Sequence, residues 1–593
     1  MKYKLRNNYT KDPEHALAEI LKDRGVIDLY DFMNPSSECE YDPYLLNNIE
    51  KAAANLLDHL KRNSNIMFIV DQDADGFTSS AILWLYIKNI YPDAKLFFLV
   101  HEHKQHGLSD VIEWIEERPN FDLVIVPDAG SYNVEEHLRL GELGIDCICI
   151  DHHEQLLDDN GNPIVSTVPS TIVVNNQLSP EYPNKSLCGA GVVYKFCEVL
   201  DDKLGIHQAS KYMDLAALGE IADVMDRTSI ETNYLMIKGL QNVQNKGFRT
   251  LIEAQSFSLK DKAVPPYEGL TPIDIAFYIA PLINAITRVG TLEEKRNMFY
   301  CFIEPDRKVQ STKRGAKLGD VETAAEQTAR IGKNAKARQD KLKERALDLI
   351  DFKIQKDQLN DNNVILVEID EEDNIPQEIT GLIAMSVVNK YHKPVMIGRR
   401  SSQGEIRGSI RSDGNFAGLP SFKKWLEDTS LLTYTAGHNN AAGFGINANK
   451  MDQFLQYANT HLNASDFENC YMVDYILDAC QVGNLPLLEE LASHPEFFGN
   501  HIDEVKVVIK NISLASVSVM GANKDSMKIS FNGVDYVKFK DLKFIDDIMS
   551  NRMKKLTIYG RANMNEWMGQ KSVQIFIEDY ELEEEDKTHK YDF

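Results

Sequence analysis

The stretch FIVDQDADGFTSSAI, residues 68–82, decides how the N-terminal half of this chain folds. An apolar run that ends at Val70 is followed by three aspartates at alternate positions, Asp71, Asp73 and Asp75. Gly76 and several small hydroxyl residues come next. The apolar run predicts a buried strand. Three carboxylates crowded at the end of such a strand would repel one another, so they need a partner.

The same alternation of strand and helix continues from about residue 60 to residue 240. Short apolar runs recur as NIMFIV (65–70), KLFFLV (95–100), DLVIVP (122–127), DCICI (146–150) and TIVVN (171–175). The segments between them are typical of helices. We therefore expect an α/β domain whose parallel sheet is covered by helices on both faces.

The rest of the chain predicts a long connecting helix and two further domains. A basic stretch ending near Ile350 is typical of one helix, NNVILVEID (362–370) opens a second α/β unit, and alternating strands from about 470 favour a small β-barrel. Asn532-Gly533 predicts a hairpin turn in that barrel. We assign 1–305 to an N-terminal segment plus the first domain, 306–350 to the connecting helix, 351–465 to the second domain, 466–585 to the barrel and 586–593 to a disordered acidic tail.

Composition limits the class of protein. A chain of 593 residues is too long for one core. The net charge, 64 − 90 = −26, argues against a broadly basic surface, although a basic groove can be local. No apolar stretch reaches the ~20 residues that span a bilayer, so we expect a cytoplasmic protein without membrane contact. Eight cysteines form no CxxC pair, and Cys147 and Cys149 alternate in an apolar strand, which indicates buried thiols and neither a disulfide framework nor a zinc site.

Metal-type ligands follow several of the predicted strands and one helical stretch. These are Asp128 in DLVIVPDAGS, Asp151, His152 and His153 in DCICIDHHE, and Glu220, Asp223 and Asp226 in DLAALGEIADVMD. An aspartate after a strand is often only a helix cap. Mixed carboxylate and imidazole ligands from four strand or helix ends favour Mn²⁺ or Mg²⁺ over structural zinc. Two such ions would remove the repulsion between the carboxylates and suit phosphodiester hydrolysis.

The motifs DQDADGFTS, PDAGS, DHHE and ALGEIAD, in this order and spacing, resemble the four motifs of the DHH phosphoesterase superfamily. Further segments are similar to the RecJ family of single-strand-specific 5′→3′ DNA exonucleases: RGVIDLYDFMNP, YPNKSLCGAGVVYKF, IAPLINAITRVG and NEWMGQKSVQIFIEDYEL. GEIRGSIRS and AGHNNAAGF look like a DHHA1 domain. The resemblance covers roughly residues 13 to 585 and implies a DHH–DHHA1–OB arrangement.

The resemblance also implies roles for individual residues. The implied metal ligands are Asp71, Asp73, Asp75, Asp128, His152 and Asp223, with Asp128 as the bridge and Asp71 as an additional ligand or a carboxylate behind the ligands. The implied catalytic residues are Asp75, Asp128 and His153, of which His153 would contact the scissile phosphate or help the leaving group.

Phosphate contacts are implied as well. The implied residues are Arg288, Ser409, Arg411 and His438. The family usually has an arginine where this chain has His101, with Lys104 nearby, and we expect one of these two to take its place. In the barrel, Trp567, Tyr559 and Lys571 are candidates for contacting a DNA strand, although an aromatic residue there is as often core as platform.

The function that the resemblance implies is a two-metal, Mn²⁺- or Mg²⁺-dependent exonuclease. It would degrade single-stranded DNA from the 5′ end to mononucleotides in repair or recombination, as a monomer, with a single-strand-binding protein or a repair helicase as candidate partner. Two alternatives stay open. One is a phosphodiesterase of short oligonucleotides or cyclic dinucleotides, which the barrel and IAPLINAITRVG disfavour. The other is a silent DNA-binding scaffold, which the complete set of ligands disfavours.

Overall fold

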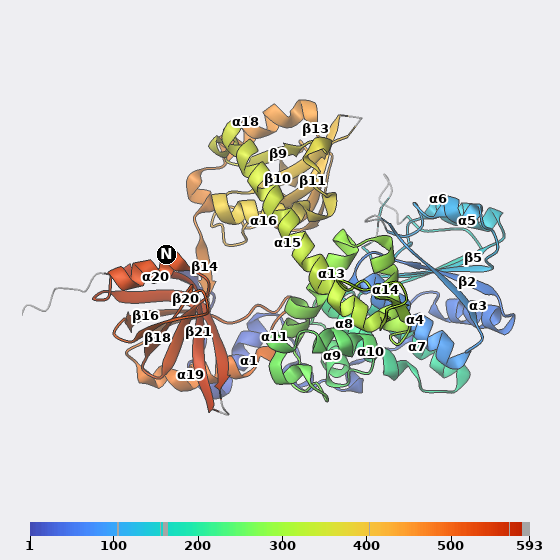
Figure 1. The fold of residues 1–593 in the computed structure, drawn as a ribbon, viewed down its shortest axis with the longest axis horizontal. Helices are drawn as coiled ribbons and strands as arrows, with labels where there is room; N and C mark the ends of the chain where they lie inside the picture. Colours follow the sequence, from blue (N-terminus) through green and yellow to red (C-terminus); the bar gives the residue numbers. More distant parts are fainter. Residues whose placement is uncertain (103–105, 155, 158–163, 402–403, 568–569, 584–593) are drawn as a thin grey trace, which may run out of the picture. The chain divides into compact units, whose positions relative to one another are not determined.

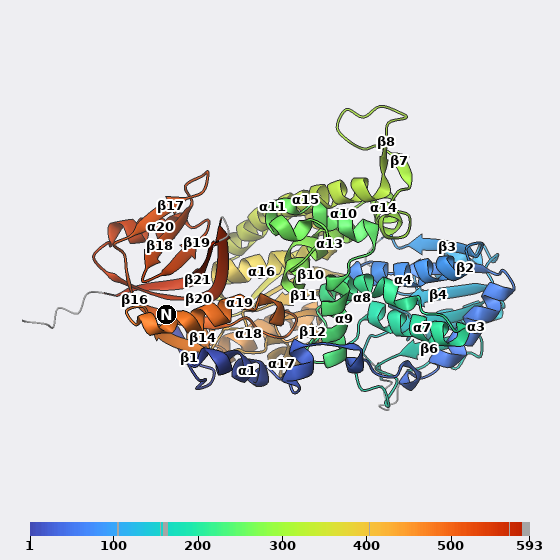
Figure 2. The ribbon, with the colours of Figure 1, turned by 90° about the horizontal axis from the view of Figure 1, so that it is seen from below.

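The computed structural model describes the whole chain except residues 103–105, 155, 158–163, 402–403, 568–569 and 584–593. The described chain divides into two compact units. The first unit contains residues 24–338 and 496–503, and the second contains residues 1–23, 339–495 and 504 onward. The elements of both are labelled in Figures 1 and 2.

The first unit is built on a parallel sheet. Its strands are β2 (Asn65–Val70), β3 (Lys95–Val100), β4 (Leu123–Pro127), β5 (Asp146–Asp151) and β6 (Thr171–Asn175). All five lie where the apolar runs predict them, and every neighbouring pair is parallel. The strand order is β3-β2-β4-β5-β6. The predicted α/β fold with a parallel sheet is confirmed.

Helices cover both faces of this sheet, as the near-continuous apolar strands require. Along β2, Ile66, Phe68 and Val70 face the larger core, and Met67 and Ile69 face a smaller one. The larger core is closed by α3 (Ile49–Lys61), α4 (Ala74–Ile90) and α7 (Gly189–Leu204), and the smaller by α5 (Ile112–Glu116) and α6 (Val134–Glu142) (Figure 1). The connection from β5 to β6 differs from the expectation, because its described residues contain no helix.

The remainder of the first unit is mostly helical, as expected. Its helices are α2 (Leu29–Met33), α8 (Met213–Ala222), α9 (Ile230–Gln241), α10 (Lys246–Glu253), α11 (Ser256–Leu259), α12 (Pro272–Asp274), α13 (Ala280–Val289) and α14 (Leu292–Ile303). Among the described residues, one stretch, Pro272–Val289, is apolar and long enough to cross a membrane, but half of it is buried. Ile275, Ile279 and Ile283 belong to the larger core, which accounts for its apolar composition.

The predicted connecting helix over 306–350 begins later than expected. Residues Lys308–Gln310 (β7) and Val321–Thr323 (β8) pair as an antiparallel hairpin, and the helix α15 runs from Ala324 to Lys356 (Figure 2). Gly315 and Gly319 in the hairpin loop have φ of 86° and 95°. Such left-handed conformations interrupt a helix, so the basic residues before Ala324 cannot extend it.

The second unit contains the second predicted α/β region. Its elements are β9 (Ile365–Ile369), α16 (Thr380–Tyr391), β10 (Val395–Arg400), β11 (Glu405–Arg411), α17 (Phe422–Asp428), β12 (Tyr434–His438), β13 (Ala441–Asn447) and α18 (Met451–His461). The sheet order is β12-β13-β11-β10-β9, and only the β9–β10 pair is parallel. The predicted second α/β unit is confirmed, and NNVILVEID contains its first strand, β9.

The predicted barrel strands form a seven-stranded, mostly antiparallel sheet. Its strands are β15 (Tyr475–Asp478), β16 (Lys506–Ser513), β17 (Val517–Met520), β18 (Ser526–Phe531), β19 (Val534–Lys538), β20 (Lys555–Trp567) and β21 (Gln570–Glu583), accompanied by helices α19 (Leu485–Ser493) and α20 (Leu542–Ser550). Asn532 and Gly533 have positive φ, which confirms the predicted turn. β20 and β21 are longer than expected, and the predicted acidic tail lies outside the described residues.

The sequence places the N-terminal segment with the first domain, but residues 1–23 are part of the second unit. β1 (Lys2–Leu5) pairs in parallel with β14 (Cys470–Val473), and the Arg6 backbone N–H donates to the carbonyl of Val473. Helix α1 (Pro13–Asp23) completes this segment of the second unit. Because strand pairing joins residues far apart in the sequence, local periodicity cannot predict this placement.

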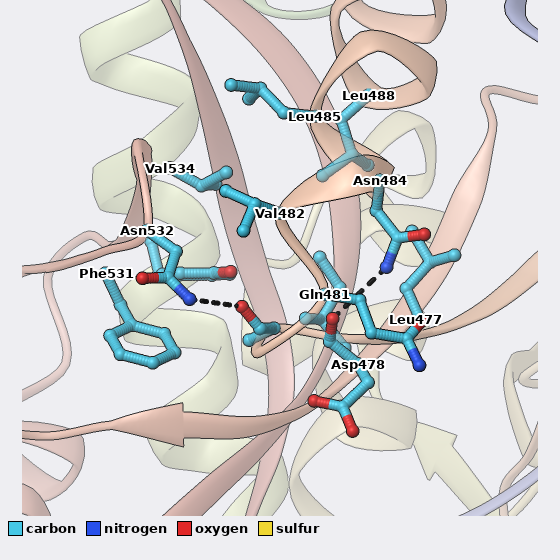
Figure 3. A pocket seen from close by; sticks show the side chains of 13 residues that line it. Leu477, Asp478, Gln481, Val482, Asn484, Leu485, Leu488, Phe531, Asn532 and Val534 are labelled. Carbon is cyan, nitrogen blue, oxygen red and sulfur yellow. Dashed lines mark hydrogen bonds between the residues drawn. The ribbon is translucent and has the colours of Figure 1, made fainter.

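A small pocket in the second unit lies between α19 and strands of the seven-stranded sheet (Figure 3). Its lining is mostly apolar, with Leu477, Val482 and Leu485 among the side chains, and Asp478 as the charged one. It offers no cation to a phosphate, so we place no nucleic-acid contact there.

Candidate metal centre

The predicted ligands of the first unit converge where the order of the strands reverses. β2 has β3 on one side and β4 on the other, so the chain leaves the sheet in opposite directions after β2 and after β4. Ligands of open α/β sheets bind in the crevice at this point. Asp71, Asp73 and Asp75 follow β2, and Asp128 follows β4.

The first turn of α4 fixes two of these carboxylates. Asp73 is the N-cap of the helix, and its side chain accepts the backbone N–H of Gly76 at 3.0 Å. Asp75 accepts the backbone N–H groups of Gly189 at 2.6 Å and Ala190 at 2.9 Å, at the start of α7. A Cβ on Gly189 would lie 2.4 Å from Asp128 Oδ1, so only glycine permits this approach.

Asp128 occupies a strained position at the end of β4. Its φ is 71°, in the left-handed region that few non-glycine residues adopt. Its backbone N–H donates to the carbonyl of Ile150 at 2.6 Å, which ties it to β5. The side chain is buried, and its Oδ1 has no hydrogen-bond partner among the described residues. Strain and an unpaired buried oxygen together mark a functional position.

His152 joins the carboxylates from three elements. Its Nε2 lies 3.2 Å from Asp128, 3.6 Å from Asp223 and 3.7 Å from Asp75. Asp223 reaches the centre from the C-cap of α8, which ends at Ala222. The helix expected to carry Asp223 and Asp226 thus stops before both of them.

The electrostatics of the cluster require a cation. Burial and the neighbouring Asp75 raise the pKa of Asp128 well above its usual range and that of Asp223 to about 8. Burial, Asp71 and Asp75 raise the pKa of Asp73 to about 6. Burial lowers the pKa of His152, which keeps its imidazole neutral and able to act as a ligand.

The donor set fits divalent metal ions. Two groups of ligand atoms, Asp75–His152–Asp223 and Asp71–Asp73–Asp128, each lie within 4.8 Å of one another. Asp71 Oδ1, like Asp128 Oδ1, is buried without a hydrogen-bond partner among the described residues. Hard oxygen donors with one imidazole suit Mn²⁺ or Mg²⁺. The six predicted metal ligands therefore lie together, and two of them have buried oxygens without a hydrogen-bond partner among the described residues, as positions that bind a cation would.

His153 is held by Asp151, a carboxylate at the end of β5 to which the resemblance gave no individual role. Its Nδ1 lies 2.7 Å from Oδ1 of Asp151, and Oδ2 of Asp151 accepts the Ser131 backbone N–H at 3.0 Å. Burial opposes the charge on His153, but the hydrogen bond and charge of Asp151 outweigh it and raise the pKa of His153 to about 9. Asp151 thus fixes the orientation of His153 and favours its protonated form.

Asp151→Asn tests this positioning role. We expect cleavage to fall by roughly 10- to 100-fold, as for other residues that orient a catalytic histidine. The alkaline limb of the pH–rate profile should also move to lower pH, because His153 loses the carboxylate that keeps it protonated. Measuring the rate from pH 6 to 10 in both proteins checks this. An unchanged alkaline limb would show that the protonation of His153 does not control the rate at high pH.

Of the two residues expected to replace the family's arginine, His101 is not placed to contact a phosphate, and Lys104 stays a prediction. His101 is fully buried, lies 2.9 Å from Asp110 and 4.0 Å from Asp71, and so backs a ligand instead of facing a phosphate. His106, for which the sequence indicated no role, is exposed at the surface and lies 2.6 Å from Asp71. Lys104 lies outside the described residues.

Arg288 lies within electrostatic range of Asp73 in the centre. It stands in the last turn of α13, where burial lowers its pKa and the charge of Asp73 opposes that shift. A half-buried guanidinium within electrostatic range of Asp73 is suited to hold a phosphate.

The three phosphate contacts predicted in the second unit lie on one sheet. Arg411 and His438 are both in register with Ala441, so they occupy one row across β11, β13 and β12. Ser409 lies two residues before Arg411, on the same face of β11, and its hydroxyl is 3.0 Å from that of Thr380 in α16. A Cβ on Gly381 would lie 2.3 Å from the Arg411 guanidinium, so α16 leaves room for this side chain.

The candidates for contacting a strand in the barrel differ in placement. Tyr559 is buried and stacks on Tyr471 with ring centroids 4.1 Å apart, so it belongs to the core and not to a platform. Lys571 is exposed on β21. The side chain of Trp567 lies outside the described residues.

Residues 496–503, which follow most of the second unit in the chain, are part of the first unit and form hydrogen bonds on both sides of Asp223 in the sequence. Asn500 Nδ2 donates to the carbonyls of Glu220 and Ile221 at 3.3 Å each, and His501 Nε2 lies 3.0 Å from the carbonyl of Val224. The buried Arg227 donates to the carbonyls of Glu496 and Phe498, at 2.8 Å and 2.9 Å. These bonds enclose the end of α8 where Asp223 stands.

Comparisons with known proteins agree with this geometry. The DHH family, N-terminal domain, matches residues 65–220, and the RecJ OB domain matches residues 473–579. A Bacillus subtilis protein named "Putative SPbeta prophage-derived single-strand DNA-specific exonuclease YorK" is 36% identical, over 98% of both chains. The chain belongs to the RecJ-like DHH family.

Two RecJ proteins are also similar to this RecJ-like chain, one in sequence and one in structure. The single-stranded-DNA-specific exonuclease RecJ of Bacillus subtilis is 25% identical over 93% of this chain and 66% of its own length. The crystal structure of RecJ in complex with Mn²⁺ from Thermus thermophilus matches with a TM-score of 0.67 and 21% identity, over 96% of this chain and 76% of that one. The latter supports the fold of the RecJ-like chain, including its C-terminal OB domain.

Proposed function

We propose that this chain is a metal-dependent exonuclease that degrades single-stranded DNA from its 5′ end to mononucleotides. The observation that carries the proposal is the cluster of five aspartates and His152 at the switch point of a DHH-type sheet, in which two buried carboxylate oxygens have no hydrogen-bond partner among the described residues. Relatives named single-strand-DNA-specific exonucleases support the substrate class.

The ligand roles follow from the positions of the side chains. Asp71, Asp73, Asp75, Asp128, His152 and Asp223 would hold two ions of Mn²⁺ or Mg²⁺. Bound ions of this kind supply an activated water and stabilise charge on the phosphate. The protonated His153, oriented by Asp151, would donate a hydrogen bond to the scissile phosphate or a proton to the leaving oxygen.

Phosphates away from the reacting bond would be held by cationic and small side chains. Arg288 would contact the strand next to the metal centre. Ser409, Arg411 and His438 would contact it on the second unit, where glycine and alanine residues of β13 leave the backbone accessible. Lys571 on β21 is the remaining candidate of the OB domain that the described side chains support.

A cleavage time course with 5′-labelled and 3′-labelled single-stranded DNA tests the activity and its polarity. We expect immediate release of a labelled mononucleotide from the 5′-labelled strand with Mn²⁺ or Mg²⁺, and none with chelator or on blunt duplex. Mononucleotide release from the 3′-labelled end would reverse the polarity. Preference for dinucleotides over longer strands would favour a small-substrate phosphodiesterase, and no cleavage of any substrate would favour a binding scaffold.

The biological setting remains a prediction. We propose a monomer that acts in the cytoplasm, in DNA repair or recombination, with a single-strand-binding protein or a repair helicase as partner. Sedimentation of the purified chain would test whether it is a monomer. Capture with a single-strand-binding protein would test that partner.

A further inference from the structure

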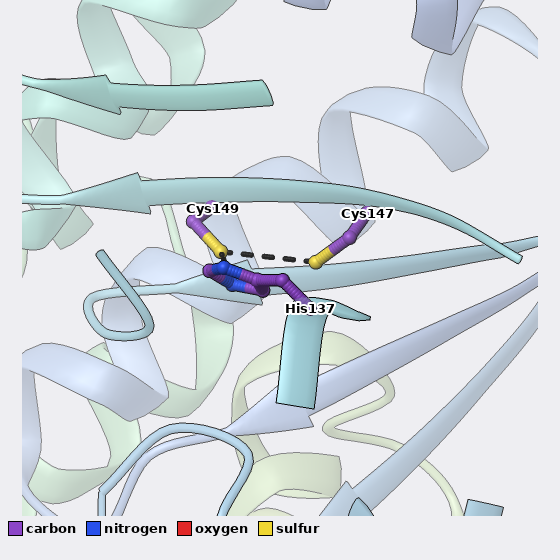
Figure 4. Close-up of side chains that lie close together, drawn as sticks. All are labelled: His137, Cys147 and Cys149. Atoms are coloured by element: carbon purple, nitrogen blue, oxygen red, sulfur yellow. Dashed lines mark hydrogen bonds between the residues drawn. The ribbon is translucent and has the colours of Figure 1, made fainter. Parts of the chain in front are cut away.

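A second group of metal-type side chains lies in the first unit, apart from the carboxylate centre. His137 of α6 meets Cys147 and Cys149 of β5 in the smaller core (Figure 4). His137 Nε2 lies 3.4 Å from Cys149 Sγ, and the two sulfurs are 3.8 Å apart. None of the three side chains has exposed surface. This meeting was not expected from the sequence, because His137 lies on a helix and the cysteines on the strand that follows it, and the pattern of neither element shows that they face each other.

These separations match the edges of a metal coordination shell. With Zn–S bonds of ~2.3 Å and Zn–N bonds of ~2.0 Å, a tetrahedral ion separates two sulfurs by roughly 3.8 Å and a sulfur from a nitrogen by roughly 3.5 Å. All three donor atoms lie within 4.8 Å of one another. Two cysteines at alternate positions of one strand point to the same face, so the backbone already places both sulfurs toward His137.

The burial of these three side chains is a second argument for a bound metal ion. Thiols are weak hydrogen-bond donors, so contacts among two thiols and an imidazole compensate poorly for burial. Nδ1 of His137 and the hydroxyl of Thr171 are also buried without hydrogen-bond partners among the described residues. Thr171 is in register with Cys147 on the neighbouring strand β6. Its hydroxyl is therefore an oxygen donor on the same face for a fourth coordination position.

We propose that His137, Cys147 and Cys149 bind a thiophilic metal ion of the Zn²⁺ class, at a structural site separate from the carboxylate centre. Binding would release one proton from each thiol, while the neutral imidazole binds through the lone pair of Nε2. Two thiolates and one divalent ion sum to zero charge, which an apolar core tolerates. Cu⁺ shares the preference for thiolates but would leave one negative charge buried.

Such an ion would also stiffen the strand that carries the catalytic histidine. Cys149 lies two residues before Asp151 on β5, and Asp151 orients His153. Cys149 and Asp151 point to the same face of the strand, so fixing one restrains the other. The Cys₂His site would therefore act on stability and on the position of Asp151, without contact with substrate.

Cobalt substitution distinguishes the two centres of the intact protein. Thiolate ligands give Co²⁺ a ligand-to-metal charge-transfer band in the near ultraviolet, which oxygen and imidazole ligands do not give. We expect this band in the reduced wild-type chain and in Cys197→Val, which alters a buried thiol elsewhere in the same unit. We expect its loss in Cys149→Val, whose side chain suits the surrounding apolar core.

Elemental analysis after purification under reducing conditions and dialysis against EDTA provides the second readout. We expect about one Zn²⁺ per chain to remain in the wild type and none in Cys149→Val, since thiolate-bound structural zinc is held tightly. Retention of copper instead would overturn the assignment to Zn²⁺. Absence of both the retained ion and the cobalt band from the folded wild type would show that the three side chains are only core residues.

Discussion

Asp128→Asn is expected to reduce cleavage of single-stranded DNA by roughly three orders of magnitude or more, because the proposed metal centre would lose the carboxylate expected to bridge its two ions. The same substitution should leave the fold intact. In the presence of chelator we expect the free energy of unfolding to rise by about 1–2 kcal/mol. A substitution that abolishes activity but raises the free energy of unfolding indicates that the protein keeps the original residue for its chemistry and not for its stability.

Two features of Asp128 lead to this expected gain. Its buried Oδ1 has no hydrogen-bond partner among the described residues and is close to the charges of Asp75, Asp73 and Asp71, so a neutral amide removes repulsion. Its φ of 71° lies in the left-handed region, which asparagine adopts more readily than most residues. Urea unfolding with EDTA and cleavage with Mn²⁺ measure the two effects separately.

Asp214→Asn is the matched control, since it changes another buried aspartate of the same unit. Asp214 accepts the backbone N–H groups of Gln244 at 2.7 Å and Asn245 at 2.6 Å, outside the metal centre. We expect it to lose about 1–3 kcal/mol of stability and to keep its metal-dependent rate where it is folded. If Asp128→Asn loses stability like the control, its carboxylate has a structural role; if it cleaves within tenfold of wild type, the bridging role is wrong.

The fold was predictable from the sequence where local patterns decide it. The five strands of the parallel sheet coincide with β-branched apolar runs, and the Asn532-Gly533 turn has the two positive φ angles that its sequence favours. The meeting of the acidic and imidazole side chains that follow β2, β4 and β5 was predictable too, because the carboxyl ends of parallel strands share one edge. Each of these conclusions depends on residues close together in the chain.

Contacts between distant segments were out of reach of such reasoning. The pairing of β1 with β14 and the meeting of His137 with Cys147 and Cys149 have no periodicity that announces them. His101 looked like a substitute for an arginine, yet its buried contacts with Asp110 and Asp71 give it a supporting place. A single sequence presents the residue type, and only tertiary packing shows which way the side chain faces.

Arg227 presents the clearest case of a residue whose importance only packing reveals. Its guanidinium is fully buried and donates to Asn233 Oδ1 and to the carbonyls of Glu496 and Phe498. Burial lowers its pKa to about 9, which leaves it charged at neutral pH. Replacing it with methionine would remove the Arg227 donors from two buried acceptors, Asn233 Oδ1 and the carbonyl of Phe498. We expect Arg227→Met to lower the free energy of unfolding by about 3 kcal/mol or more.

The loss should extend to the metal centre, because the segment that Arg227 anchors also holds the end of α8. Asn500→Gly isolates that effect, since it removes the two side-chain hydrogen bonds to Glu220 and Ile221 behind Asp223, and glycine readily adopts the φ of 45° found at this position. We expect roughly tenfold weaker Mn²⁺ binding in Asn500→Gly with little loss of stability, as for other residues that support a ligand. Arg118→Met, which breaks an exposed ion pair with Glu117, should change neither quantity. Unchanged Mn²⁺ affinity in Asn500→Gly would mean that Asp223 is positioned by α8 alone, and that residues 496–503 serve the first unit only as part of its core.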